Sequence, residues 1–266
     1  MSINNLYSQK WQKFLKRVWP FKFIPFVELV LAAGSLATGN ACPPHNLRQK
    51  EPVQGTAQVM WGMHENSDFD VIVGVRQGRI FTARAFCILA FGMLGWRAKH
   101  PNSLKSLPLQ YTVLLKWKHP SKDKLCFNHF VTPAAYRLSP PHNEYWKNLY
   151  KNLVPVYGEP VVIQKFFDAN ADWLQERRRY KSDQRHVYKK KRLVARIREW
   201  LLKGKFGDWL EKILKAIQIT RIENSLKNQS GYKPRIIYSD NELEFHPHTQ
   251  RIEQYLEKEP EKAKLS

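Results

Sequence analysis

The first hundred residues alternate between strand-like hydrophobic runs and polar breaks. The run at 23–33 (FIPFVELVLAA) is rich in β-branched and aromatic residues and stops at a Gly-Ser pair, so it predicts a strand followed by a turn or short helix. A second strand is predicted at 68–75 (DFDVIVGV), followed by an apolar-faced helix at about 79–98. The polar stretch 42–64 between the strands lacks periodicity, and we interpret it as an inserted loop.

The pattern changes from strands to helices near residue 140. Further strands are predicted before it, and helical periodicity dominates after it until the strand-like RIIYS near the C-terminus. The fold class that follows is α/β (α+β), with a mixed sheet in 1–140 and a helical, basic region in 141–266. The later strands are expected at 109–117 and 124–131, and the helices at 143–153, 161–177 and 208–228.

Composition adds a strong charge to this picture. Lys and Arg total 44 against 23 Asp and Glu, which gives a formal charge of +21 and favours a polyanionic partner, without choosing among nucleic acid, nucleotide and acidic membrane. The three cysteines have no paired spacing, which favours a reducing cytoplasmic location over a disulfide framework. The longest apolar stretch, 83–96, falls short of the roughly 18 residues that a transmembrane helix needs.

The most informative chemistry lies in the two predicted strands. Alternate residues of a strand share a face, so Asp68 and Asp70 are expected to point the same way while Phe69 points into the core. Two neighbouring carboxylates suit Mg²⁺ or Mn²⁺. Gly34 lets the backbone approach a phosphate, and Ser35 and the amides of a turn can hydrogen-bond its oxygens. An isolated Asp-x-Asp also fits a solvated strand edge.

These residues resemble the signature of the polymerase β-like nucleotidyltransferase superfamily, here LVLAAGSLATGNA and ENSDFDVIVG. The segments GRIFTAR, KLCFNHFV, LVPVYGEP, FFDANADWL and FHPH resemble bacterial stand-alone nucleotidyltransferase-domain proteins. The resemblance implies a nucleotidyltransferase palm in 1–140, with Asp68 and Asp70 as catalytic metal ligands and Gly34 and Ser35 holding a nucleoside triphosphate.

The chain departs from that pattern in two ways. The 42–64 loop makes the separation between Gly-Ser and Asp-x-Asp much longer than the dozen residues usual in the superfamily. A third carboxylate, where the superfamily places its general base, is missing from the later predicted strands: 124–131 offers Asn128, and Asp123 falls in a turn. Either the base is elsewhere or catalysis is impaired.

Arg79 and Arg84, near the start of the 79–98 helix, are candidates for nucleotide phosphate contacts, although capping or surface exposure explains them equally well.

A zinc site from the inserted loop is an alternative with little support, because the spacing of its ligands matches no common site. For the two histidines of EFHPHT, packing in a turn is the default explanation. The residues concerned are Cys42, His45 and His64 for zinc, and His246 and His248 in the turn.

The stretch RRRYKSDQRHVYKKKRLVARIR interleaves basic and aromatic residues, as in surfaces that contact phosphates and stack on bases. A solvated face is the alternative. The candidate nucleic-acid contacts are Arg177, Arg178, Arg179, Lys189, Lys190, Lys191 and Arg192.

Together these features predict an enzyme that transfers a nucleoside monophosphate from a metal-bound triphosphate to an acceptor such as RNA. The main alternative is a non-catalytic RNA-binding module that keeps the fold, which the missing third carboxylate favours and the intact Asp-x-Asp opposes. A toxin or resistance enzyme that modifies a small molecule is a further alternative, for which the charge of +21 offers no reason.

Overall fold

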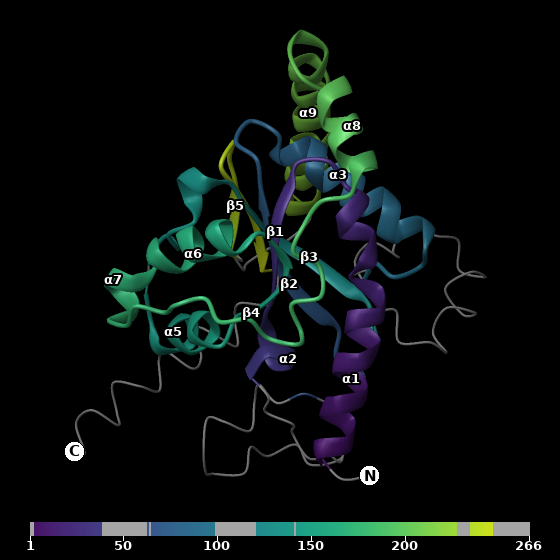
Figure 1. The fold of residues 1–266 in the computed structure, drawn as a ribbon. Helices are drawn as coiled ribbons and strands as arrows, with labels where there is room; N and C mark the ends of the chain where they lie inside the picture. The colour runs from purple at the N-terminus through teal and green to yellow at the C-terminus, as the bar shows by residue number, and fades with distance from the viewer. Residues whose placement is uncertain are drawn as a thin grey trace.

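The computed structural model describes residues 3–38, 63, 65–98, 121–140, 142–227 and 235–246. Their strands form a six-stranded mixed sheet in the order β4-β1-β2-β3-β6-β5 (Figure 1). β2 and β3 are parallel, and the other neighbouring pairs are antiparallel. The strands are β1 (Val27–Ala32), β2 (Phe69–Val75), β3 (Leu125–Val131), β4 (Val154–Gly158), β5 (Arg235–Tyr238) and β6 (Glu242–His246).

Helices cover both faces of the sheet, which confirms the predicted α/β (α+β) class. Phe69 and Val71 of β2 face a core shared with α1, α3 and α9, whereas Ile72 faces a core shared with α5, α6 and α7 (Figure 1). The helical elements are α1 (Ile3–Arg17), η1 (Trp19–Phe23), α2 (Gly34–Thr38), α3 (Ile80–Met93), η4 (Pro133–Ala135), α5 (Glu144–Lys151), α6 (Pro160–Asp168), α7 (Ala171–Leu174), α8 (Leu193–Leu201) and α9 (Lys205–Lys227).

Two predicted elements have different bounds in the structure. The first strand begins at Val27 rather than at residue 23, because η1 precedes it and Phe26 adopts a left-handed φ of 65°. The helix predicted to reach residue 98 ends at Met93, since Gly95, with a φ of 67°, turns the chain there. Residues 42–62 and 64 of the predicted loop and the strand predicted at 109–117 lie outside the described residues.

The sheet crosses the boundary suggested near residue 140, because β4, β5 and β6 complete the sheet that β1, β2 and β3 begin. The C-terminal region is therefore not purely helical. Its predicted helix at 161–177 is divided into α6 and α7 at Asn170. The buried amide of Asn170 donates to Tyr136 O at 2.7 Å and accepts from Leu138 N at 3.0 Å.

Lys10 of α1 binds the segments that lead into both parallel strands, β2 and β3. Its side chain is only 2% exposed and donates to Glu65 O at 2.7 Å, Ser67 O at 3.0 Å and Asp123 Oδ1 at 2.6 Å. Burial lowers the pKa of the Lys10 ammonium group, and the hydrogen bond and charge of Asp123 oppose that effect. Because Ser67 precedes β2 and Asp123 precedes β3, one ammonium group sets where both strands start.

We predict that Lys10→Met lowers the free energy of unfolding by about 3 kcal/mol or more, because it removes a buried ion-pair partner and leaves two carbonyls without this donor. The matched control is Lys13→Met, which removes a 49% exposed partner of the same carboxylate and should cost about 1 kcal/mol or less. Urea unfolding monitored by circular dichroism measures both values. Equal losses in the two variants would contradict the anchoring role.

Candidate functional site

The turn after β1 brings Gly34 directly against Asp70. Ala33 N donates to Asp70 O at 3.0 Å, which continues the β1–β2 pairing into the turn. Gly34 has a φ of +61°, and a Cβ added there would lie 2.4 Å from Asp70 Oδ2. A side chain at this position would therefore displace the carboxylate. Ser35 follows in the first turn of α2, as the sequence predicts.

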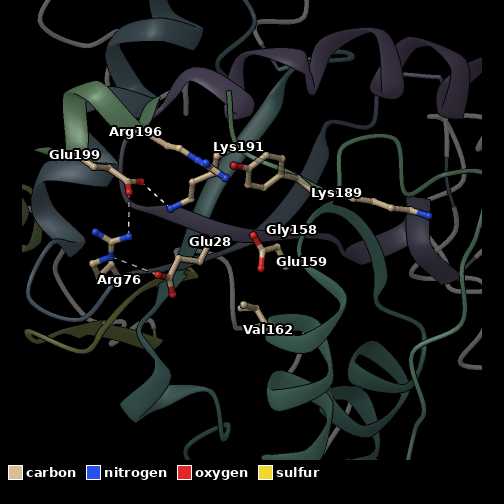
Figure 2. A pocket seen from close by; sticks show the side chains of 10 residues that line it. Glu28, Arg76, Gly158, Glu159, Val162, Lys189, Lys191, Arg196 and Glu199 are labelled. Carbon is tan, nitrogen blue, oxygen red and sulfur yellow. Dashed lines mark hydrogen bonds and ion pairs between the residues drawn. The ribbon is translucent and has the colours of Figure 1, made fainter. Parts of the chain in front are cut away.

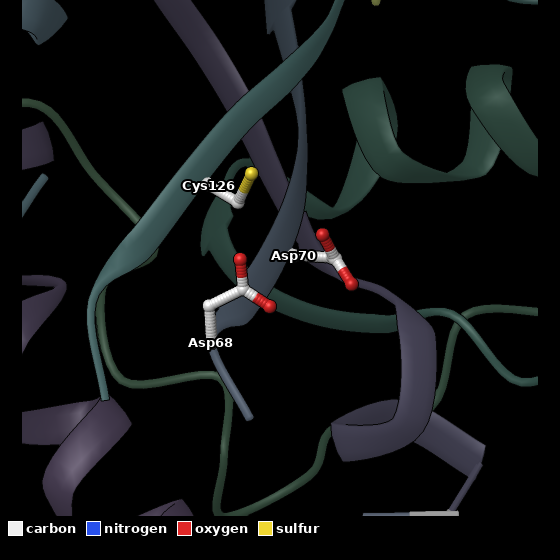
Figure 3. A group of neighbouring side chains, drawn as sticks. All are labelled: Asp68, Asp70 and Cys126. Atoms are coloured by element: carbon white, nitrogen blue, oxygen red, sulfur yellow. The ribbon is translucent and has the colours of Figure 1, made fainter. Parts of the chain in front are cut away.

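Asp68 and Asp70 lie on one side of β2 together with Cys126 of β3 (Figure 3). Asp70 pairs with Cys126 across the parallel strands, and a hydrogen bond joins Cys126 to Asp68. One potential metal-ligating atom from each residue lies within 4.8 Å of the others. The structure thus places Gly34, Ser35, Asp68 and Asp70 at one end of the sheet.

This cluster brings two partly buried carboxylates together with a buried thiol. Burial raises the pKa of Asp70 to about 8, and the charge of Asp68 adds to the effect. Burial and then the charges of Asp70 and Asp68 raise the pKa of the Cys126 thiol well above its ordinary value. A divalent cation would relieve the repulsion, and the paired carboxylate oxygens fit Mg²⁺ or Mn²⁺. The protonated thiol is a poor ligand for either ion.

β3 carries no third carboxylate. Cys126 and Asn128 stand there instead, and Asp123 is engaged by Lys10 and Lys13 at 2.6 Å and 2.9 Å. Burial would raise the pKa of Asp123, but these hydrogen bonds hold it below its ordinary value. Asp123 therefore serves to anchor α1.

Buried carboxylates do occur one strand further across the sheet, on β6. Glu242 and Glu244 lie with His129 of β3 so that one ligand atom from each is within 4.8 Å of the others. His129 Nε2 is 3.1 Å from Glu242 Oε1. Pairing of Ile72 with His129 and of His129 with Glu244 places this group on the sheet face that carries Asp70. The alternation in ELEFH is the sequence signal for this group, which was not among the predicted site residues.

Tyr145 of α5 links the two groups electrostatically. Burial raises the pKa of its hydroxyl, and the charges of Asp70 and then Glu244 raise it further. Both carboxylates therefore act on one phenol. Glu244 lies two strands from β2, roughly 10 Å across the sheet.

Arg79 and Arg84 do not join Asp68 and Asp70. β2 carries the chain about 16 Å from Asp70 to Val75 before either arginine is reached. Arg79 Nη2 is 2.6 Å from Asp208 Oδ1, so it holds the start of α9.

Arg84 likewise contacts α9. It donates to Gln218 Oε1 at 2.6 Å, and its guanidinium group lies over the ring of Phe245. Burial lowers the pKa of Arg84 to about 10, and the charge of Arg97 adds to that effect.

The predicted nucleic-acid contacts divide into exposed and engaged side chains. Arg178 donates to Leu153 O at 2.6 Å and lies over the ring of Phe167, while Lys191 Nζ is 2.6 Å from Glu199 Oε1. These two hold the basic segment against the protein. The exposed ones are Arg177, Arg179, Lys189, Lys190 and Arg192, of which Arg177 lies 3.5 Å from Asp168 and Lys189 donates to Ser182 at 3.1 Å.

A cavity of about 250 Å³ lies where this segment meets the other end of the sheet (Figure 2). Arg76 stands there between Glu28 at 3.5 Å and Glu199 at 2.9 Å, and Lys191 also reaches Glu199. The cavity is thus lined by an ion-pair network that joins α8 to the sheet. It contains neither Asp68 nor Asp70.

The proposed zinc ligands Cys42, His45 and His64 lie outside the described residues, as does His248, and His246 is described only as the last residue of β6. Among the described helices, none has both the length and the apolar character needed to cross a membrane.

No protein-family model matches the chain, and no curated protein or solved structure matches it either.

We predict that Asp70→Asn stabilises the metal-free protein at alkaline pH. Folding raises the pKa of Asp70 from its unfolded value near 4 to about 8, so the wild type loses stability as pH rises through that interval, and asparagine removes the loss. In EDTA, the variant should melt about 2–4 °C or more above wild type at pH 8.5, with little gain at pH 4. Asp172→Asn, which removes an exposed partner of Arg137, should give no gain at either pH and serves as control. A pH-independent difference for Asp70→Asn would contradict the account.

Proposed function

We propose that this protein is a metal-dependent nucleotidyltransferase that transfers a nucleoside monophosphate from a triphosphate to an acceptor. The observation that carries the proposal is the close approach of Gly34 to the partly buried carboxylate of Asp70, with Asp68 beside it. A glycine turn and two carboxylates at the same strand end offer amide donors and cation ligands at one point.

Asp68 and Asp70 would hold Mg²⁺ or Mn²⁺. When bound, such an ion neutralises phosphate charge as pyrophosphate leaves. Gly34 keeps the space beside Asp70 clear of a side chain, while Ser35 and the amides of the turn donate to phosphate oxygens. These residues orient the α-phosphorus for attack by an acceptor hydroxyl.

RNA is the acceptor that the surface favours. The exposed cations between Arg177 and Arg192 provide phosphate contacts, and the formal charge of +21 raises the rate of encounter with polyanions.

The second candidate is a non-catalytic RNA-binding module. Cys126 and Asn128 on β3 favour it, because a protonated thiol binds Mg²⁺ poorly and an amide has neither the charge of a carboxylate nor the basicity to accept a proton.

We predict that Mg²⁺ together with a nucleoside triphosphate raises the melting temperature of the wild-type protein, because ligand bound to the native state stabilises it. Asp70→Asn should abolish this shift by removing a cation ligand, and Gly34→Ala should abolish it by displacing the Asp70 carboxylate. Gly78→Ala is the matched control, since Gly78 also has a positive φ of 71° but no atom within 4 Å of the added methyl.

Labelled ribonucleoside and deoxyribonucleoside triphosphates, incubated with total RNA, test the transfer itself. Labelled RNA that is lost with Asp70→Asn supports the enzyme. Absence of both transfer and thermal shift with all eight triphosphates would contradict it, and salt-sensitive RNA binding retained by Asp70→Asn would then favour the non-catalytic module.

A further inference from the structure

α8 turns its apolar side away from the protein. Its buried residues are Ala195 and Glu199, whereas Leu193, Ile197 and Trp200 are 70%, 48% and 73% exposed. These exposed positions are three or four apart and so form one stripe. Amphipathic helices normally bury such a stripe, but within the described part of the chain nothing covers this one.

The stripe continues onto the first turns of α9, after a turn at Gly204 with a φ of 79°. Phe206 and Trp209 are exposed and stack on each other with ring centroids 6.0 Å apart. In Figure 1, α8 and the start of α9, which are joined by this turn, lie at the top of the view and project beyond the sheet. The surface that we call the apolar tip consists of Leu193, Val194, Ile197, Trp200, Leu201, Phe206 and Trp209.

The acidic residues of 193–212 all bond to the body of the protein. Glu199 accepts from a backbone amide and two cations at the sheet end. Asp208 lies 2.6 Å from Arg79 Nη2, and Glu211 accepts from the backbone amides of Phe81 and Thr82 in α3 at 2.9 Å and 2.8 Å. The exposed charges around the apolar tip are therefore predominantly positive. They belong to Arg192, Arg196, Arg198, Lys203, Lys205 and Lys212.

An occupant of this surface must be apolar at its centre and anionic at its rim. A second copy of the chain fits poorly, because a symmetric contact would bring the same basic rim onto itself. RNA matches the rim, but the aliphatic side chains of Leu193, Ile197 and Leu201 offer it neither donors nor stacking faces. An anionic lipid bilayer meets both requirements, since tryptophan and leucine enter the boundary below the headgroups while arginine and lysine contact lipid phosphates.

We propose that the apolar tip docks this protein on the surface of an anionic membrane. Trp200, Leu201, Phe206 and Trp209 enter the interface, and the surrounding arginines and lysines bind the headgroups. Asp70 lies toward the opposite end of β2 from the contact between Arg76 and α8, so the candidate site lies away from the docked surface.

Flotation of the full chain with vesicles of phosphatidylcholine alone, or of phosphatidylcholine and phosphatidylglycerol at about 7:3, tests the proposal. Wild type should float with the anionic vesicles, bind at least about ten-fold less to the neutral ones, and be released as salt increases. Trp200→Gln/Trp209→Gln should lower the anionic partition coefficient at least about ten-fold. Met93→Gln/Val161→Gln is the matched control, because it removes two equally exposed apolar side chains elsewhere and should stay within about two-fold of wild type.

Circular dichroism spectra and melting temperatures close to wild type are required of both variants. Failure of the wild type to float with anionic vesicles would overturn the proposal. It would equally be overturned if the tip variant floated as well as wild type, since net charge alone would then explain binding. A wild-type dimer in light scattering that the tip variant converts to a monomer would assign the apolar tip to a second copy instead.

Discussion

Partial burial of Asp70 beside Asp68 is the constraint on which the rest of the site depends. Two carboxylates on one strand face repel each other, and removal from water raises the free energy of the charged form of Asp70. Such an arrangement costs stability unless a cation is bound. The neighbouring residues nevertheless maintain this arrangement. Glycine at position 34 leaves space for the Asp70 carboxylate, and Lys10 binds the segments that precede both strands of the cluster. A local cost that the fold maintains in this way is typical of functional sites.

The two ends of β2 are used differently. One end carries the turn at Gly34 and the carboxylates, whereas the other meets α8 through Arg76 and Glu199. Glu199 also accepts from Lys191 and from the amide of Phe26, so α8 is held by polar contacts rather than by its apolar stripe. This explains how α8 stays on the protein while presenting tryptophan and leucine to the outside. The sheet thereby separates the proposed chemistry from the proposed membrane contact.

Local patterns were sufficient to predict the strands around the candidate site. Alternation in DFDVIVGV predicts the shared face of Asp68 and Asp70, and the Gly-Ser break predicts where β1 ends. Long-range pairing could not be predicted in this way. The group formed by His129 and Glu244 depends on antiparallel pairing of segments more than one hundred residues apart.

Tertiary contacts also override local patterns elsewhere. The sequence suggests that Arg79 could contact a phosphate, but in the structure it forms an ion pair with Asp208, which lies far along the chain. The stripe of α8 has the spacing of a buried helix face, and only the packing of Ala195 and Glu199 shows that it faces outward.

The most direct test of the account is to locate a cation crystallographically. Crystals grown with Mn²⁺ and a non-hydrolysable nucleoside triphosphate would be measured for anomalous scattering. We expect a manganese peak bound by the carboxylates of Asp68 and Asp70, with the triphosphate against the turn at Gly34. A peak only between His129, Glu242 and Glu244, or none at either group at saturating Mn²⁺ and nucleotide, would contradict it.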